Sequence, residues 1–156
     1  MKNAKKTAMV TLVALASLVS TGFGSNRSRS TPKVESQDVT ARRVNIIKSG
    51  SAQQKAAAAF WLSQQPSLEA CVIDSLAGLL GDKTLVDSSQ YRYIVEERKS
   101  TLGEEVALAL VRIGPASIQP LIHVLKTSPL PEARKNAARA LGALHESGAT
   151  ADPSAV

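Results

Sequence analysis

From about residue 52 onward, apolar residues recur three, four and seven positions apart. An α-helix turns once every 3.6 residues, so this spacing places them on one helical face. Four segments carry the pattern: Ile73, Leu76, Ala77 and Leu80; Val106, Ala109, Leu110 and Ile113; Ile118, Leu121, Ile122 and Leu125; and Ala137, Ala140, Leu141 and Leu144. An alanine-rich stretch over residues 52–65 adds a fifth helix. The spacing predicts an all-α fold.

Glycine and proline separate the second of these segments from the third. Gly114 can adopt the left-handed conformation that ends helices, and Pro115 suits the first turn of the next one. Pro120 would cost about 3 kcal/mol in a helix interior. If Ser117 caps the helix, however, Pro120 is its third residue, where no backbone N–H needs a helical partner. The prolines therefore mark the start of a new helix.

The helical segments fall into two alternating types. A shift of 31 residues lays Ala109 and Leu110 on Ala140 and Leu141, and a shift of 45 lays residues 72–80 on residues 117–125. Each pair of such helices has one apolar face for its own partner and another for the next pair, so the pairs must stack. We expect a short right-handed α-solenoid of about two and a half antiparallel helix pairs.

Residues 105–144 read EVALALVRIGPASIQPLIHVLKTSPLPEARKNAARALGAL. This order of an Ala-Leu helix, Ile-Gly, Pro, a Pro-Leu-Ile helix and an Ala-Ala-x-Ala-Leu-Gly helix resembles the HEAT-repeat family, specifically the short phycobilisome-lyase-like type. The resemblance implies a HEAT/armadillo-type domain over residues 49–147 and a non-enzymatic role in protein–protein interaction or as a scaffold. The lyase-like members imply an alternative, a protein that handles a chromophore or another ligand. Residues 52–82 match loosely, because Ser75 stands where the motif has proline.

The first 24 residues predict a signal peptide. Three lysines precede an apolar stretch over residues 8–19, and the small residues Gly22 and Gly24 fit the positions that a signal peptidase reads. The chain is therefore expected to be exported, to the periplasm or the cell exterior. The alternative is an uncleaved N-terminal segment that anchors the protein in the membrane.

The positive charge of the chain lies mainly before the helical region. Of the formal net charge of +6, residues 1–24 carry +3, residues 25–48 carry +4 and residues 49–156 carry −1. Residues 25–48 begin rich in Ser and Arg and predict a flexible basic linker, and residues 148–156 predict a disordered tail. The nearly neutral helical region argues against a nucleic-acid partner. Membrane contact is expected only through the linker or an uncleaved signal.

One insertion makes the repeats unequal. Ile118 and Ala137 are 19 residues apart, whereas Ile73 and Val106 are 33 apart, so the first repeat contains 14 additional residues, placed near 83–101. Long loops in compact arrays are often binding elements, and Tyr and Arg are favoured at interfaces. Tyr91, Arg92 and Tyr93 are therefore the candidate binding residues. The alternative is that they cover the side of the stack, as a short strand or as the start of the helix that contains Val106.

Residues for catalysis or metal binding are not evident. His123 and His145 lie on different predicted helices, without the paired spacing of a metal-binding helix. The pairs Glu96-Glu97 and Glu104-Glu105 could act as acid and base or bind calcium, but adjacent carboxylates on a helix point to different faces and favour a solvated surface. The sequence predicts no catalytic residue, no cofactor and no metal.

The remaining expectations concern cysteine and self-association. Cys71 is the only cysteine, so the exported chain can form no internal disulfide, and its thiol is predicted to be a small apolar filler. Two and a half repeats leave apolar end faces, which Phe60 and Trp61 or a second copy of the chain could shield. The expected partner is a protein of unknown identity.

Overall fold

The structure is a computed structural model that describes residues 32–92 and 99–148. Helices make up most of these residues, which confirms the predicted predominance of α-helix. They are α1 (Pro32–Ser49), α2 (Ala52–Leu62), α3 (Ala70–Ala77), α4 (Ser89–Arg92), α5 (Leu102–Ile113), α6 (Ile118–Thr127) and α7 (Pro131–Glu146), with a 3-10 turn at Gly114–Ser117. Two short strands, β1 (Leu85–Asp87) and β2 (Lys99–Thr101), lie between α3 and α5.

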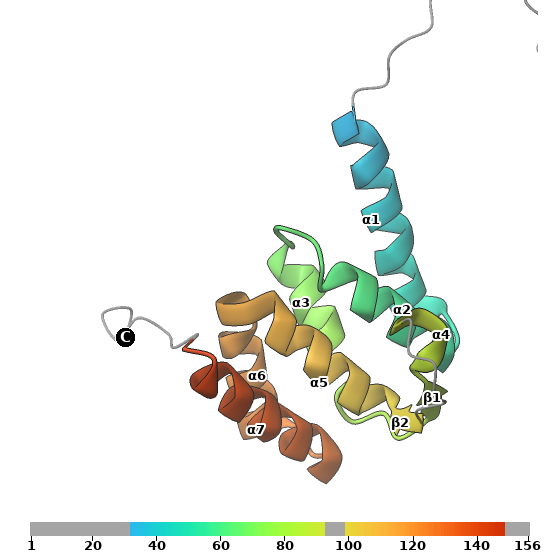
Figure 1. Ribbon diagram of the computed structural model, residues 1–156. Helices are drawn as coiled ribbons and strands as arrows, with labels where there is room; N and C mark the ends of the chain where they lie inside the picture. Colours follow the sequence, from blue (N-terminus) through green and yellow to red (C-terminus); the bar gives the residue numbers. More distant parts are fainter. Residues whose placement is uncertain (1–31, 93–98, 149–156) are drawn as a thin grey trace, which may run out of the picture.

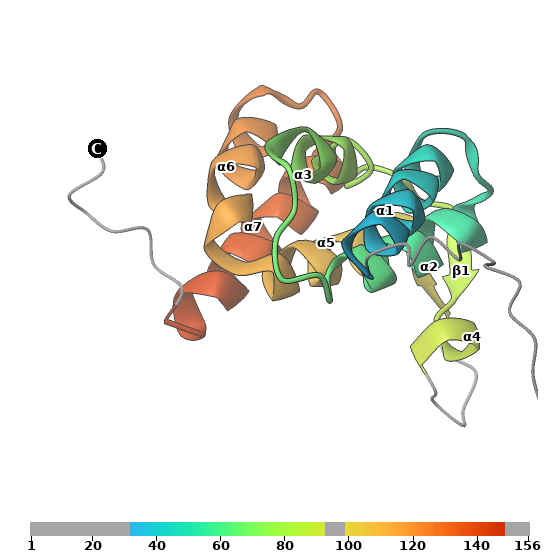
Figure 2. The same cartoon turned by 90° about the horizontal axis from the view of Figure 1, so that it is seen from above.

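The longer helices form two layers. Helices α1, α3 and α6 lie side by side in one layer, and α2, α5 and α7 lie side by side in the other (Figure 2). Successive helices pack across the layers, α1 on α2, α3 on α5 and α6 on α7 (Figure 1). Helices distant in sequence therefore become neighbours within each layer.

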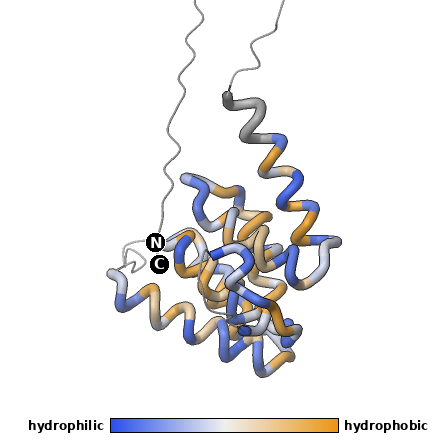
Figure 3. Tube along the Cα trace, turned by 45° about the vertical axis from the view of Figure 1, so that its right-hand side comes forward, coloured by the Kyte–Doolittle hydropathy of each residue, from blue (hydrophilic) through white to orange (hydrophobic). Residues whose placement is uncertain are grey.

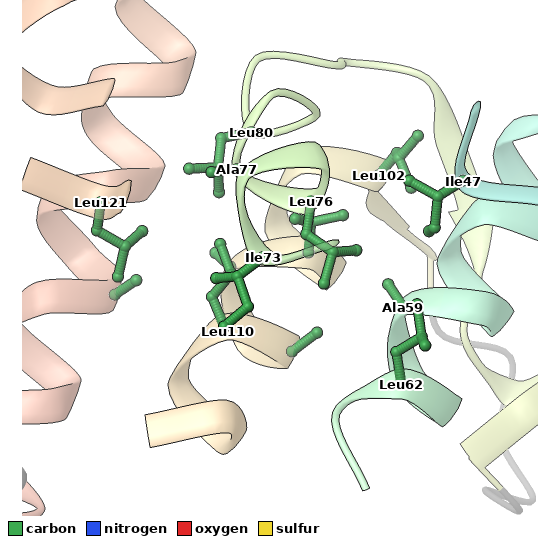
Figure 4. Packing of buried hydrophobic residues seen from close by; sticks show 14 of the residues in the cluster. Ile47, Ala59, Leu62, Ile73, Leu76, Ala77, Leu80, Leu102, Leu110 and Leu121 are labelled. Atoms are coloured by element: carbon green, nitrogen blue, oxygen red, sulfur yellow. The ribbon is translucent and has the colours of Figure 1, made fainter. Parts of the chain in front are cut away.

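The core lies between the layers and is built mainly from the periodic apolar faces. Figure 4 shows Leu62, Leu76, Leu110 and Leu121, which come from α2, α3, α5 and α6 and point into the same interior. All four side chains are fully buried. The predicted face of α6 is buried less completely, because Leu125 is exposed at the end of its layer. The hydrophobic effect therefore holds the helices together most strongly near the middle of the stack.

The ends of α5 and α6 largely follow the sequence signals. Gly114 ends α5 with a positive φ of 84°, and Pro120 is the third residue of α6, as predicted. The expected side-chain cap by Ser117 is wrong. Its hydroxyl instead donates to the carbonyl oxygens of Leu110, at 2.8 Å, and Gly114, at 2.7 Å. This buried hydroxyl ties the turn to the end of α5.

Residues 32–48 are helical, so the prediction of a flexible linker is wrong there. Pro32 is the first residue of α1, a position that tolerates its missing N–H. Ile47 is buried, and Val44 packs against the core near the end of the helix (Figure 3 shows hydrophobic and hydrophilic residues alternating along α1). The guanidinium carbon of Arg43 lies 5.6 Å from the centre of the Trp61 ring. A few apolar contacts thus dock a mostly polar helix on α2.

The other predicted N-terminal and C-terminal segments fall mostly outside the structure. The signal peptide over residues 1–24 and the start of the linker, residues 25–31, lie beyond the described residues, as does the tail from residue 149. No helix within residues 32–92 and 99–148 combines the length and apolar character needed to span a membrane.

The insertion forms a small hairpin beside the helices rather than either predicted structure. Strand β1 pairs antiparallel with β2, Leu85 opposite Thr101 and Asp87 opposite Lys99. The side chain of Gln53 on α2 adds two bonds to β1, donating to the Asp87 carbonyl at 2.7 Å and accepting from the Asp87 N–H at 2.9 Å. This side chain occupies the place of a third strand and fixes the hairpin to α2.

Candidate functional site

The insertion brings a buried ion pair together. The guanidinium Nη2 of Arg92, from α4, donates to Oε2 of Glu105, from α5. The two side chains are 14% and 4% exposed, and Ser100 donates to the other carboxylate oxygen at 2.6 Å. A carboxylate so deeply buried is stable only when it is paired and hydrogen-bonded. The expectation that Glu105 lies on a solvated face is therefore wrong.

The ion pair lies against the aromatic side chain of Phe60 on α2. The guanidinium carbons of Arg92 and Arg112 lie 5.5 and 5.0 Å from the centre of the Phe60 ring, within the range of cation–π attraction. The Tyr91 ring lies 5.7 Å from the same ring, tilted by 47°. Burial of the phenol, followed by the negative charge of Glu105, raises the pKa of Tyr91. Phe60 is thus covered by α4 and α5 rather than shielding an end of the stack.

The residues predicted for binding have their side chains largely engaged within the chain. Tyr91 and Arg92 are half-buried, and the Arg92 guanidinium is held by Glu105 and Phe60. Tyr93 lies outside the described residues. These contacts match the alternative in which the insertion covers the side of the helices, because a guanidinium paired inside the protein has fewer donors for a partner. Partner binding by these three residues stays a prediction.

A groove between α5 and α7 offers a more accessible surface. This α5–α7 groove encloses about 530 Å³, with Ser100, Glu104, Glu105 and Asn136 at a polar end and Leu108, Val111 and Ala143 at an apolar end. Leu108 is 45% exposed, which is unusual for a leucine in the middle of a helix that packs on both sides. Sequence reasoning missed Leu108, because it lies off the periodic apolar face of its helix.

Close packing at the polar end holds α5 near α3 and α7. A Cβ atom on Gly103 would lie 2.4 Å from the Leu80 carbonyl oxygen, so only glycine fits there without a shift. The same oxygen accepts a hydrogen bond of 2.8 Å from Nδ2 of Asn136. Farther along α7, the small residues Gly142 and Ala143 line the groove. Small side chains there leave the groove open above Leu108.

Charged groups lie on the rim of the polar end. Thr101 and Glu104 form a capping box, in which the Glu104 carboxylate accepts from the Thr101 N–H at 3.0 Å. That backbone hydrogen bond is the main cause that lowers the pKa of Glu104, with smaller contributions from the Thr101 hydroxyl and from Arg139. The Arg139 guanidinium lies 3.6 Å from the same carboxylate and is 65% exposed. The ion pair thus lies across the rim from α5 to α7.

Two further grooves lie in the other layer. One, of about 820 Å³, separates α3 from α6 and is lined by His123 and Asp74; the other, of about 880 Å³, separates α1 from α3 and is lined by Cys71. Cys71 is exposed, 3.6 Å from a Glu69 carboxylate oxygen, so its prediction as an apolar filler is wrong. His123 and His145 are exposed, as predicted.

The chemistry of these surfaces is that of recognition. Within residues 32–92 and 99–148, no three or more His, Cys, Asp or Glu side chains are grouped so as to hold a metal ion. Comparisons with protein-family models, with curated proteins and with solved structures find no match. The α5–α7 groove combines an exposed leucine with buried hydrogen-bonding groups, which are the features of a peptide-binding surface.

Proposed function

We propose that this chain is an exported, non-enzymatic module of HEAT type that binds another protein. The observation that carries the proposal is the open α5–α7 groove, where Leu108 is exposed between two helices that otherwise bury their apolar residues. Stacked helix pairs present such grooves repeatedly, and amphipathic helices of partner proteins bind in them.

The proposed repeat has three stacked pairs, α1 with α2, α3 with α5, and α6 with α7. Equivalent positions support it. Ala109 and Ala140, related by the shift of 31 residues, are both buried, and so are Val106 and Ala137. These correspondences support a short right-handed α-solenoid, with α1 supplying the helix that the expected two and a half pairs lacked.

Export rests on the N-terminal sequence. Three lysines followed by an apolar stretch and small residues are typical of a signal peptide. The intact mass of the protein recovered from the cell envelope or medium tests this directly. We expect a chain that begins at Ser25, and a full-length mass in the cytoplasmic fraction would contradict export.

Partner binding is tested by affinity capture from the envelope and secreted fractions with the full chain as bait. Leu108→Glu places a charge on the apolar end of the α5–α7 groove and should remove the partner. Leu85→Glu is the matched control, because Leu85 is 66% exposed on β1 and does not line that groove. The wild-type chain and Leu85→Glu should retain the same protein in stoichiometric amount. Failure of the wild-type chain to retain any protein would refute the proposed function.

A further inference from the structure

We propose that the α5–α7 groove binds a segment of the partner in which a lysine or arginine lies one helical turn from an apolar side chain. The inference rests on the proposed function and adds the chemistry of the bound segment. It follows from the hydrogen-bonding groups at the polar end, from the positions of the charges around them, and from the distance to the exposed leucine.

The first observation concerns a buried amide. Asn136 is 3% exposed and lines the groove, and its Nδ2 donates to the Leu80 carbonyl. Its Oδ1 accepts no hydrogen bond from any residue that the structure describes. Buried polar atoms are nearly always paired, since an unpaired one costs about 1–3 kcal/mol. A donor supplied by a bound segment would remove that cost.

The second observation concerns the sign of the charges. The deepest ionised group at this end is the Glu105 carboxylate, and the half-exposed Glu104 carboxylate lies beside it in sequence and in the groove. The cation nearest to Glu104, Arg139, lies on the exposed rim at 3.6 Å. An anionic segment would approach two carboxylates, whereas an ammonium or guanidinium would meet Glu104 and the Asn136 oxygen. The geometry therefore favours a basic side chain.

The third observation gives the spacing. Leu108 follows Glu104 by four residues on α5, about 6 Å along the helix axis. A partner helix that lies along the groove would place side chains three or four residues apart over these two positions. Its basic residue would contact the polar end while its apolar residue covers Leu108 and Val111. The favoured segment is thus an amphipathic helix with Lys or Arg and Leu or a similar residue at that spacing.

The test uses random twelve-residue peptides displayed on phage. The library is panned against the full chain, after depletion on the Leu108→Glu variant. Enriched peptides should carry Lys or Arg three or four residues from an apolar side chain. The most enriched sequence is then synthesised with a fluorescent label, and its affinity is measured by fluorescence anisotropy with the wild-type chain and with each variant.

Two variants change the charge of the rim in opposite ways. Glu104→Gln removes the carboxylate but keeps the capping box, because glutamine serves at the third helical position equally well. It should weaken peptide binding about two- to five-fold. Arg139→Gln removes the competing cation and should strengthen binding by a similar factor of about two to five. Leu108→Glu should weaken it by about tenfold or more, and Leu85→Glu should leave it unchanged.

The outcomes separate the inference from the proposed function. Enrichment of acidic peptides, or a shift in the same direction for Glu104→Gln and Arg139→Gln, would overturn the inference. So would a captured envelope protein that binds Leu108→Glu as tightly as the wild-type chain, although the proposed function would then stand. If neither the library nor the envelope yields a binder, both fail. Circular dichroism melting checks that each variant is folded, and the exposed Arg139 and Leu108 lie outside the capping box.

Discussion

Removal of Arg92 should destabilise the protein far more than removal of its neighbour Arg112. Both guanidinium groups lie over Phe60, but only Arg92 is paired with a buried carboxylate. Loss of one member of a buried ion pair costs about 3–5 kcal/mol, because the other charge is left without its partner. Ser100 still donates to Glu105, which places Arg92→Ala near the lower end, about 3 kcal/mol. Arg112→Ala loses only an exposed cation–π contact, about 0.5–1 kcal/mol.

The assay is urea unfolding followed by circular dichroism at 222 nm, a wavelength at which helices absorb strongly, with thermal melting as a second measurement. The loss for Arg92→Ala corresponds to a decrease in melting temperature of about 10 °C or more. The double variant Arg92→Met, Glu105→Leu removes both charges and should fall within about 1 kcal/mol of the wild type. Equal losses for Arg92→Ala and Arg112→Ala would refute the reasoning, since the buried charge would then contribute nothing.

Three further predictions concern packing and pH. Gly103→Ala brings a methyl group to 2.4 Å from the Leu80 carbonyl and should cost about 1–3 kcal/mol in urea unfolding, while Gly142→Ala, which meets nothing within 4 Å, should stabilise α7 by up to about 1 kcal/mol. Burial raises the pKa of Tyr91, so folding stability should fall as pH rises above 10, where the unfolded chain ionises; Tyr91→Phe should remove this loss, and tyrosinate absorbance follows the titration. The pKa of Glu104 is lowered by the Thr101 N–H, so its stabilisation should be present above pH 4.5 and lost as pH falls below it; unfolding of Glu104→Gln should lack that part of the pH dependence.

The α1 helix shows where composition misleads. Residues 25–48 are rich in polar and charged side chains, and mean composition favours a solvated linker. The three apolar residues Val44, Ile46 and Ile47 nevertheless dock the end of α1, because α2 and α3 offer an apolar surface that the local sequence does not reveal. Whether a weakly amphipathic segment is helical thus depends on the surface that it meets.

The candidate site was even less visible in the sequence. Arg92 and Glu105 are 13 residues apart and meet only because the β1–β2 hairpin folds α4 against α5. Leu108 belongs to no periodic face, so its exposure became meaningful only when α7 was placed beside α5. The Tyr91 and Arg92 side chains, selected for their residue types, proved to be packed inward instead.

The sequence alone determined what depends on near neighbours along the chain. Apolar spacing predicted the helices that contain Leu76, Leu110 and Leu144, and Gly114 with Pro120 marked where one helix ends and the next begins, since helical hydrogen bonds connect residues only four apart. The tertiary structure alone decided which charge is buried, which cysteine is exposed and which groove stays open. Those properties depend on contacts between helices distant in sequence, and no local pattern encodes the partner that each side chain will meet.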